Sequence, residues 1–345
     1  MNPPFRLQPS AAALLPTLGL ALLSACGGGG GDDTAAIVVI PDGPRVVAAS
    51  AGTDVNTSNY TLLAAPLVRG LLSGGASDLL NPTATDRATA QAAGTAPLPV
   101  AATLVGRTLL AWLQRLPDPA RKQAAAVSTQ TLSCALGGAL TITVDDVDNN
   151  SRLGAGDRIS VLASACREDA NLPAASGGFL MTVNAAVLNS NGEPTALDVS
   201  ASFQSFTIDG FGSMTGGFRL WTRPETAAST RLRLSFLDTS VSEVSGTVVY
   251  SFDIDGLANA SSASFEISGG LGLDGQTYAL ATPTRLSGAP VGSPSAGAVT
   301  LRDAAGDTLR VVARSATTLD LEFLPAGATT PTATTTGLLW TDFED

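Results

Sequence analysis

The spacing of apolar residues changes along this chain, from a period near 3.6 in its first third to a period of two afterwards. Residues 102–116 carry apolar side chains at three- and four-residue intervals, which predicts an amphipathic helix. A weaker helix is predicted around Tyr60, because Pro66 falls inside its pattern. The apolar positions are Tyr60, Leu63, Leu67 and Leu71 in one segment, and Leu104, Val105, Leu109, Trp112, Leu113 and Leu116 in the other. We therefore expect residues 46–128 to be a mainly helical segment.

From about Thr131 onward, apolar and polar residues alternate in short runs, from Leu140, Ile142 and Val144 to Leu338 and Trp340. Turns are expected between the runs, at Asn191-Gly192, Asp209-Gly210, Asp255-Gly256, Asp274-Gly275 and residues 305–307. The pattern predicts a mainly β domain over residues 129–345, an antiparallel meander of roughly ten to twelve strands. Its shape is a curved sheet, a sandwich or a half-open barrel. No strand and helix alternation is present, which argues against a nucleotide-binding α/β fold.

Two glycine motifs and one threonine-rich stretch interrupt the alternation. Ser176-Gly177-Gly178-Phe179 and Thr215-Gly216-Gly217-Phe218 each begin an apolar run. We interpret their glycines as hairpin residues that supply a positive φ. Residues 329–336 are expected to form a surface loop before the last strand.

The N-terminus has the arrangement of an export signal. Arg6 precedes an apolar run from Ala11 to Leu23, which is too short and too interrupted to span a bilayer. The next residues, Leu23-Ser24-Ala25-Cys26, resemble the lipobox of bacterial lipoproteins. This resemblance implies that residues 1–25 are a signal peptide that is removed, and that Cys26 carries several fatty acyl chains, enough for stable membrane anchoring. The alternative is an ordinary secretory signal with an incidental cysteine.

The residues after Cys26 indicate which membrane such an anchor would enter and how it is connected to the folded domain. Gly27 stands where family members held in the inner membrane have aspartate, so the resemblance implies the outer membrane, on its periplasmic face or at the cell surface. Residues 26–45 are expected to form the lipidated cysteine and a flexible, glycine-rich tether. The membrane, through the lipid anchor, is thus the first expected partner.

Charge and composition exclude several functions. Removal of the leader takes away only Arg6, which leaves 18 basic against 30 acidic residues and a net charge of −12. Such a surface repels phosphates, so nucleic acid is not an expected partner. The chain contains no histidine, which removes Ser-His-Asp and Cys-His nucleophiles and the usual neutral-pH general base.

Cys134 and Cys166 remain after Cys26 is assigned to lipid. In an oxidising compartment an even pair predicts a disulfide. In an antiparallel hairpin the numbers of paired residues have a constant sum. Pairing Leu140 with Ser160 gives 300, and the two cysteines have the same sum. This register predicts a hairpin with the cysteines facing each other near its base.

An acidic segment at residues 145–157 lies at the tip of that hairpin. Counted from Asp146, oxygen-bearing side chains fall at positions one, three and five, an apolar residue at eight and an acidic residue at twelve. The segment resembles the calcium loop of EF-hand and dockerin proteins, in which alternate side chains surround a cation that needs six to eight oxygens. The resemblance implies calcium and a ligand set of Asp146, Asp148, Asn150, Arg152 and Asp157.

Two features depart from this family pattern. Ser151 stands where the family has glycine, and Asp157 is shorter than the usual closing glutamate. The flanking residues also have the alternating pattern of strands. The resemblance is therefore limited to the loop and does not include the helix pair that flanks it in the family. The alternative interpretation is a polar hairpin turn that binds no metal.

Other candidate sites are weaker. Asp253 with Asp255, and Asp320 with Glu322, alternate on strand faces and resemble the carboxylate pairs of glycosidases, although solvated strands often carry such pairs. An aromatic group near Trp221 either lines an apolar groove or forms part of the core; its other members are Phe203, Phe206 and Phe211.

Three functions follow from these patterns. The first is a non-enzymatic, outer-membrane-anchored binding or envelope-structural module, stiffened by the disulfide and the calcium hairpin. In layout the chain resembles uncharacterised β-rich lipoproteins of Gram-negative bacteria, a resemblance that implies no activity. The alternatives are a periplasmic carrier of lipid or another apolar ligand and a carboxylate-based glycoside hydrolase. Envelope proteins and polysaccharides are the other candidate partners.

Overall fold

The computed structural model describes residues 38–73, 127–148, 150, 152–167, 173–190, 194–210, 212–243, 246–290 and 292–343. The predicted signal peptide, Cys26 and the predicted helix at residues 102–116 lie outside the described residues. Within them the chain forms one α-helix, α2, then fourteen strands and a 3-10 helix, η1. The elements are α2 Tyr60–Ser73, β1 Val127–Ser133, β2 Ala139–Asp145, β3 Arg158–Cys166, β4 Ala175–Leu188, β5 Pro194–Ile208, β6 Gly212–Thr226, β7 Ser229–Glu243, β8 Gly246–Ala258, β9 Ala263–Leu273, β10 Gln276–Gly288, β11 Ala296–Arg302, β12 Thr308–Ala313, β13 Thr318–Leu324, β14 Ala333–Leu339 and η1 Trp340–Phe343.

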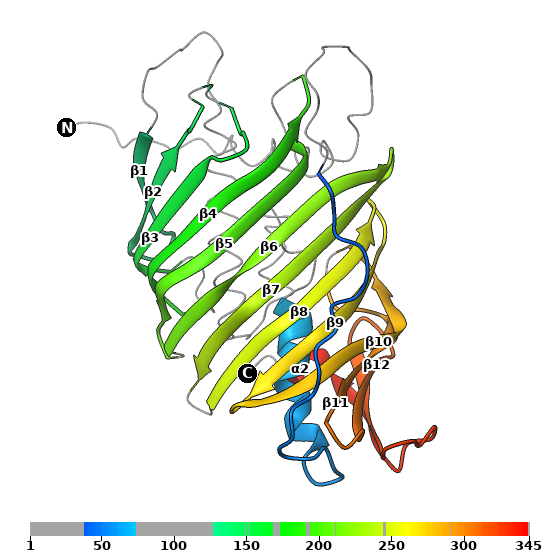
Figure 1. The fold of residues 1–345 in the computed structure, drawn as a ribbon. Helices are drawn as coiled ribbons and strands as arrows, with labels where there is room; N and C mark the ends of the chain where they lie inside the picture. Colours follow the sequence, from blue (N-terminus) through cyan, green and yellow to red (C-terminus); the bar gives the residue numbers. More distant parts are fainter. Residues whose placement is uncertain are drawn as a thin grey trace, which may run out of the picture.

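All fourteen strands belong to one open antiparallel sheet. Each strand pairs with its neighbour in the chain, from β1 at one edge to β14 at the other. The predicted meander is therefore confirmed, whereas the sandwich alternative is wrong, because all the strands of the described residues belong to a single open sheet. The sheet has more strands than expected. The predicted threonine-rich loop is partly wrong, since residues 333–336 belong to β14 and residues 333–335 pair with β13. In Figure 1 strands β10 to β12 turn away from the broad sheet of β1 to β9.

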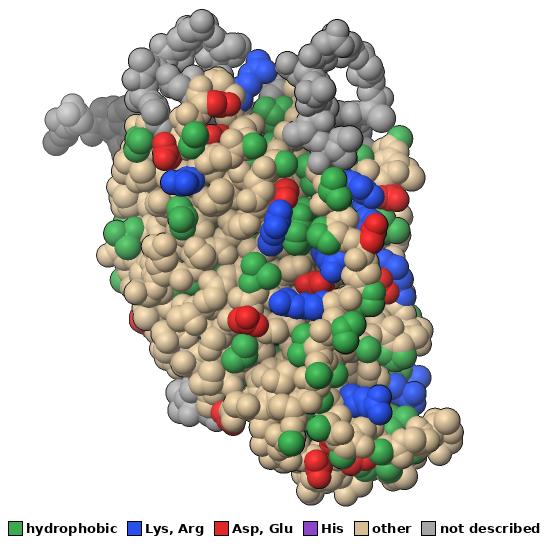
Figure 2. Space-filling view, viewed as in Figure 1, with side chains coloured by type: hydrophobic (Ala, Val, Ile, Leu, Met, Phe, Trp, Pro, Cys, Tyr) green, Lys and Arg blue, Asp and Glu red, His purple; other side chains and the backbone are tan. Residues whose placement is uncertain are grey.

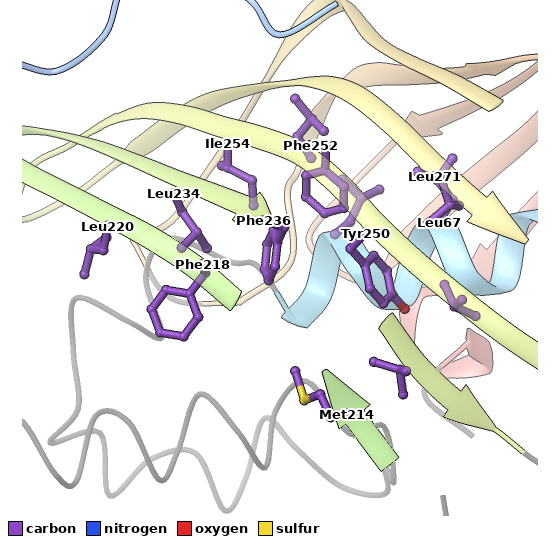
Figure 3. Packing of buried hydrophobic residues seen from close by; sticks show 14 of the residues in the cluster. Leu67, Met214, Phe218, Leu220, Leu234, Phe236, Tyr250, Phe252, Ile254 and Leu271 are labelled. Carbon is purple, nitrogen blue, oxygen red and sulfur yellow. The ribbon is translucent and has the colours of Figure 1, made fainter. Parts of the chain in front are cut away.

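The core lies against the inward face of the sheet. Strands with one buried and one exposed face alternate in burial, as in β3, where Ile159, Val161 and Ala163 are buried and Ser160 and Leu162 are exposed. Aromatic residues of three central strands point to the same side, where Phe236 lies 4.9 Å from Phe252 between ring centroids (Figure 3). The period-two alternation in the sequence therefore marked the inward face correctly.

Glycines at bulges bend the long strands. Gly177 and Gly216 both have positive φ, but they lie inside β4 and β6 and not in hairpin turns. A Cβ atom at Gly177 would collide with the carbonyl of Ser205 on β5, and one at Gly216 with the carbonyl of Asp238 on β7. Ser205 and Asp238 themselves have positive φ, and the strand registers shift beside both contacts. These are β-bulges, which increase strand twist and curvature.

Helix α2 is the part of the predicted helical layer that the structure describes, and it confirms the weaker of the two predicted helices, with Pro66 inside it. Its buried face packs on β12, β13 and η1. The Tyr60 ring lies 6.3 Å from that of Phe323, and the Tyr60 hydroxyl lies 2.7 Å from the Thr335 Oγ1 on β14. The C-terminal strands thus curve around this helix (Figure 1). Burial of one face compensates for the proline.

Residues 38–53, here called the strap, cross the outward face of the sheet (Figure 1, blue). Val38 and Ile40 are buried against Ala196 on β5 and Trp221 on β6. Further along, the Ser50 N–H donates to the Thr277 carbonyl at the start of β10. The range predicted for the flexible tether, residues 26–45, therefore extends too far, because residues 38–45 are held on the sheet.

Candidate functional site: an acidic hairpin braced by a disulfide

Strands β2 and β3 form the predicted hairpin, with residues 146–157 connecting them. Leu140 pairs with Ala163 and Asp145 with Arg158, so the constant sum is 303. The predicted register of 300 is therefore wrong by three positions. The prediction failed because Cys134 belongs to the turn between β1 and β2 and precedes the first residue of β2. The pair of cysteines therefore does not follow the register of the two strands.

Cys134 and Cys166 form the predicted disulfide, with Cα atoms 5.5 Å apart. Ala165, with φ 44°, displaces the end of β3, and the β3 to β4 register shifts at this point. The Cys134 N–H donates to the Gly138 carbonyl at 3.1 Å, and the Arg167 N–H donates to the Gly137 carbonyl at 3.0 Å. The bulge and this turn bring the two cysteines together although they are not a regular cross-strand pair.

Three carboxylates converge at the opposite end of the hairpin. Asp146, Asp148 and Asp157 each offer an oxygen atom, and these atoms lie within 4.8 Å of one another. Three negative charges at this separation repel unless a cation or a proton joins them. Carboxylate oxygens are the ligands that calcium prefers, so the residue types fit such an ion.

Asp157 is the buried member of the group, with 1% of its surface exposed. Its Oδ1 accepts the Val147 N–H at 3.0 Å and its Oδ2 accepts the Gly154 N–H at 2.8 Å. Burial raises the pKa of Asp157, the two backbone N–H donors oppose this, and the charges of Asp146 and Asp148 raise it further. The carboxylate closest to the core is thus the one for which compensation by a cation matters most.

Asn150, predicted as an oxygen ligand, lies beside Asp148 and presents its amide nitrogen to that carboxylate. Its Nδ2 donates to the Asp148 Oδ2 at 2.6 Å, and its Oδ1 accepts the Arg152 N–H at 2.6 Å. Coordination by the Asn150 side chain would require the amide to rotate and exchange its oxygen and nitrogen. Arg152 is exposed, and its own contact here is through the backbone.

The loop is fixed to the sheet on its far side. The Gly156 N–H donates to the Val183 carbonyl at 2.8 Å, and the Val183 N–H donates to the Asp157 carbonyl at 2.9 Å. Leu153, the apolar eighth position, is 3% exposed and belongs to the main core. The loop is therefore bonded directly to β4 and packed on the core.

The two carboxylate pairs considered as glycosidase dyads are engaged by arginines. Asp253 and Asp255 on β8 pair with Arg233 and Arg231 on β7, with closest distances of 2.5 and 2.9 Å. Asp320 pairs with Arg314 at 2.6 Å. Glu322 pairs with Arg310 and lies 3.5 Å from Arg314. Cross-strand ion pairs of this kind stabilise neighbouring strands. This contact pattern accounts for the alternating carboxylates without assigning them a catalytic role.

The aromatic group near Trp221 is divided between the two faces of the sheet. Phe203 and Phe206 belong to the core, 5.6 Å apart between ring centroids, while Phe211 lies outside the described residues. Trp221 lies under the strap on the outward face, where the Arg219 guanidinium is 4.6 Å from its ring centroid. The described members of the group therefore do not line one groove.

The strap and the ion pairs beside it were not anticipated from the sequence. Arg233 donates to the Pro41 carbonyl at 2.5 Å, and Arg45 donates to the Phe236 carbonyl at 2.6 Å. Charged side chains gather along the strap and the strands beside it (Figure 2). The alternating Arg231 and Arg233 on one strand and Asp253 and Asp255 on the next were a usable signal of cross-strand pairing.

No family model, no curated protein and no solved structure matches this chain. Among the residues that the structure describes, no helix is both long and apolar enough to cross a bilayer.

Proposed function

We propose that this chain is an outer-membrane lipoprotein with a non-enzymatic binding or envelope-structural role, in which the β2–β3 hairpin holds a calcium ion. The lipobox-like Leu23-Ser24-Ala25-Cys26 and the apolar run before it support the lipid anchor. The convergence of three carboxylates on one disulfide-braced hairpin carries the calcium part of the proposal.

Calcium in this loop would act as a structural brace. Asp146 and Asp148 lie at the start of the connection and Asp157 at its end, so one ion would join both ends of the loop. The disulfide closes the same hairpin at its other end. Because Asp157 is hydrogen-bonded to β4 through its carbonyl, the brace would extend beyond the hairpin to the body of the sheet. A rigid rim of this kind suits a domain that binds an envelope protein or a polysaccharide.

Calcium titration of the mature chain, kept soluble by Cys26→Ser, tests the metal site. Calorimetry and thermal melting should show one equivalent bound and a higher melting temperature. The Asp146→Ala, Asp148→Ala variant should show neither effect. A matched control, Asp209→Ala, Glu225→Ala, removes the same charge from two exposed positions, in the turn between β5 and β6 and near the end of β6, and should bind calcium as the wild type does. If wild type, loop variant and control respond alike, the loop is only a turn and the calcium proposal fails.

Lipidation is tested separately on the full chain. Mass spectrometry of the protein from bacterial outer membranes should show a mature N-terminus at Cys26 with its acyl chains, whereas Cys26→Ser should be released as a soluble protein. Recovery of the wild-type protein in soluble form, without acyl chains, would contradict the anchor.

An apolar carrier is the second candidate, favoured by the width of the inward apolar face. Strands β4 to β8 direct aromatic side chains to this face, while the described helix packs on β12 and β13. The aromatic residues are Phe179, Phe203, Phe206, Phe218, Phe236, Tyr250 and Phe252. Extraction of purified protein followed by mass spectrometry tests for bound lipid. A lipid-free preparation that takes up no fluorescent fatty acid would count against this function.

A further inference from the structure

The strap begins, at Val38, at the same end of the sheet that carries the acidic loop. Val38 and Ile40 pack with Ala196 and Trp221, and Ala185 and Val187 on β4 border this cluster. These positions lie near the turn between β4 and β5 and the turn between β6 and β7. The acidic loop is bonded to the same stretch of β4 through Val183. We call this the loop end of the sheet.

The opposite end of the sheet carries the disulfide. Cys134 lies in the turn between β1 and β2, and Cys166 ends β3. The turn between β5 and β6 is on this side too, because the Asp209 N–H donates to the Ala174 carbonyl just before β4. We call this the disulfide end.

Val38 is held firmly at the loop end. Its side chain is 4% exposed and that of Ile40 is 2% exposed. The strap then bonds to β7 and β9, where the Arg45 N–H donates to the Ser268 Oγ at 3.0 Å and its guanidinium donates to the Phe236 carbonyl. The point at which the chain enters the sheet is therefore fixed in space.

The distance along the chain from Val38 to Cys26 is short. Twelve residue steps span at most about 40 Å when fully extended, and about 20 Å on average for a glycine-rich chain. From Ala196 to Ile208, β5 alone runs about 40 Å toward the disulfide end at the usual rise of a strand. An anchor on Cys26 would therefore reach the disulfide end only with its chain stretched to the limit, whereas the loop end lies within its average reach.

We propose that the loop end of the sheet faces a phospholipid surface, with the acidic hairpin beside the headgroups and the disulfide end directed away from the membrane. This inference rests on the proposed lipid anchor at Cys26. Val147, 57% exposed at the start of the acidic loop, supplies an apolar contact at this surface. A cation in the loop would lie between the carboxylates and the lipid phosphates and attract both. The disulfide end is then the part available to envelope partners.

Energy transfer from labelled protein to labelled lipid tests this orientation. Ala228→Cys places a single free thiol in the exposed turn between β6 and β7, at the loop end, and Asp209→Cys places one in the exposed turn between β5 and β6. The two labels mark opposite ends of β6, whose 15 residues separate them by about 50 Å. Full-length lipidated protein carrying a donor on either thiol is reconstituted into phosphatidylethanolamine and phosphatidylglycerol vesicles that contain a headgroup-linked acceptor.

The expected result is transfer several-fold more efficient from the label at position 228 than from the label at position 209. The Cys26→Ser form of each labelled variant supplies the background. Equal transfer from the two positions, or stronger transfer from position 209, on protein that floats with the vesicles would overturn the orientation and leave the anchor intact. Protein that is not lipidated and does not float with the vesicles would overturn the anchor itself, and the orientation with it.

Discussion

The Arg233 Nη2 lies 2.5 Å from the Asp253 Oδ2 on the neighbouring strands β7 and β8, and each side chain is only 7% exposed. The same guanidinium donates to the Pro41 carbonyl of the strap. Asp253 also lies 3.9 Å from Arg45 of the strap. One buried ion pair thus joins two central strands and the segment that crosses them.

Removal of one partner from this pair should be costly. Asp253→Ala leaves the Arg233 charge buried without its carboxylate, so we expect the free energy of unfolding to fall by about 3 to 5 kcal/mol. Urea denaturation at neutral pH measures the change. Asp42→Ala is the matched control, since Asp42 is 90% exposed in its pair with Arg231 and should contribute little. An Asp253→Ala midpoint close to that of Asp42→Ala would contradict the structural role of the buried pair.

The strap should detach when its apolar contact with the sheet is reduced. Ile40→Ala removes a buried side chain from the small cluster with Trp221, at an expected cost of about 2 to 5 kcal/mol. Because the strap has few other apolar contacts, we expect local opening before global unfolding. Trypsin cleavage after Arg45 under native conditions measures this opening and should be faster in Ile40→Ala. Val39→Ala, at a position 68% exposed, should leave the cleavage rate unchanged; equal rates in both variants would show that the apolar contact does not hold the strap.

Local sequence patterns were sufficient to predict most of the sheet. Runs such as Leu140, Ile142 and Val144 became strands because one face of each strand is buried and the other is not. Asp209-Gly210 and Asp274-Gly275 form turns as expected. Asp255-Gly256 does not, because Gly256 pairs with Leu232 on one side and Phe265 on the other, inside β8. Strand pairing on both sides overrides the turn preference of the dipeptide.

Features that depend on distant residues were not predictable in the same way. The Arg45 N–H bonds to Ser268, 223 positions later, and no periodicity in the strap signals this contact. The predicted hairpin register failed because the Ala165 bulge and the Cys134 to Gly138 turn break the constant-sum rule. The disulfide itself was predicted correctly, because that prediction rested on an even pair of cysteines in a chain expected to be exported, and not on the strand register.

The disulfide should stabilise the domain mainly by restricting the unfolded chain. Its sequence separation is 32 residues, for which the loop-entropy relation gives about 3 to 4 kcal/mol. We expect Cys134→Ala, Cys166→Ala to lower the free energy of unfolding by this amount, as measured by urea denaturation without reductant. Reductant should lower the wild-type midpoint toward that of the variant and leave the variant unchanged. A variant as stable as the oxidised wild type would show that the cross-link contributes nothing to this fold.

Asp157 should make the metal-free protein less stable as the pH rises. Burial raises its pKa in the folded state above the ordinary value of 3.8, so the folded protein holds this proton more tightly than the unfolded chain does. The resulting stabilisation is fully present below 3.8 and is lost as the pH rises through the raised folded pKa, by up to about 1.4 kcal/mol per pH unit. Asp157→Asn has no proton to lose, so it should lack this part of the pH dependence.

Urea denaturation with a calcium chelator, at a series of pH values from below 3.8 to about 7, measures the difference between wild type and Asp157→Asn. The variant should gain stability relative to wild type as the pH rises, although it loses the acceptor for one backbone N–H. If the loop binds calcium, added calcium should reverse this trend for the wild type at neutral pH and leave the variant unaffected. A difference that is constant across the whole pH range would mean that the Asp157 carboxyl titrates alike in the folded and unfolded states, and its burial would then be compensated by the N–H groups of Val147 and Gly154 alone.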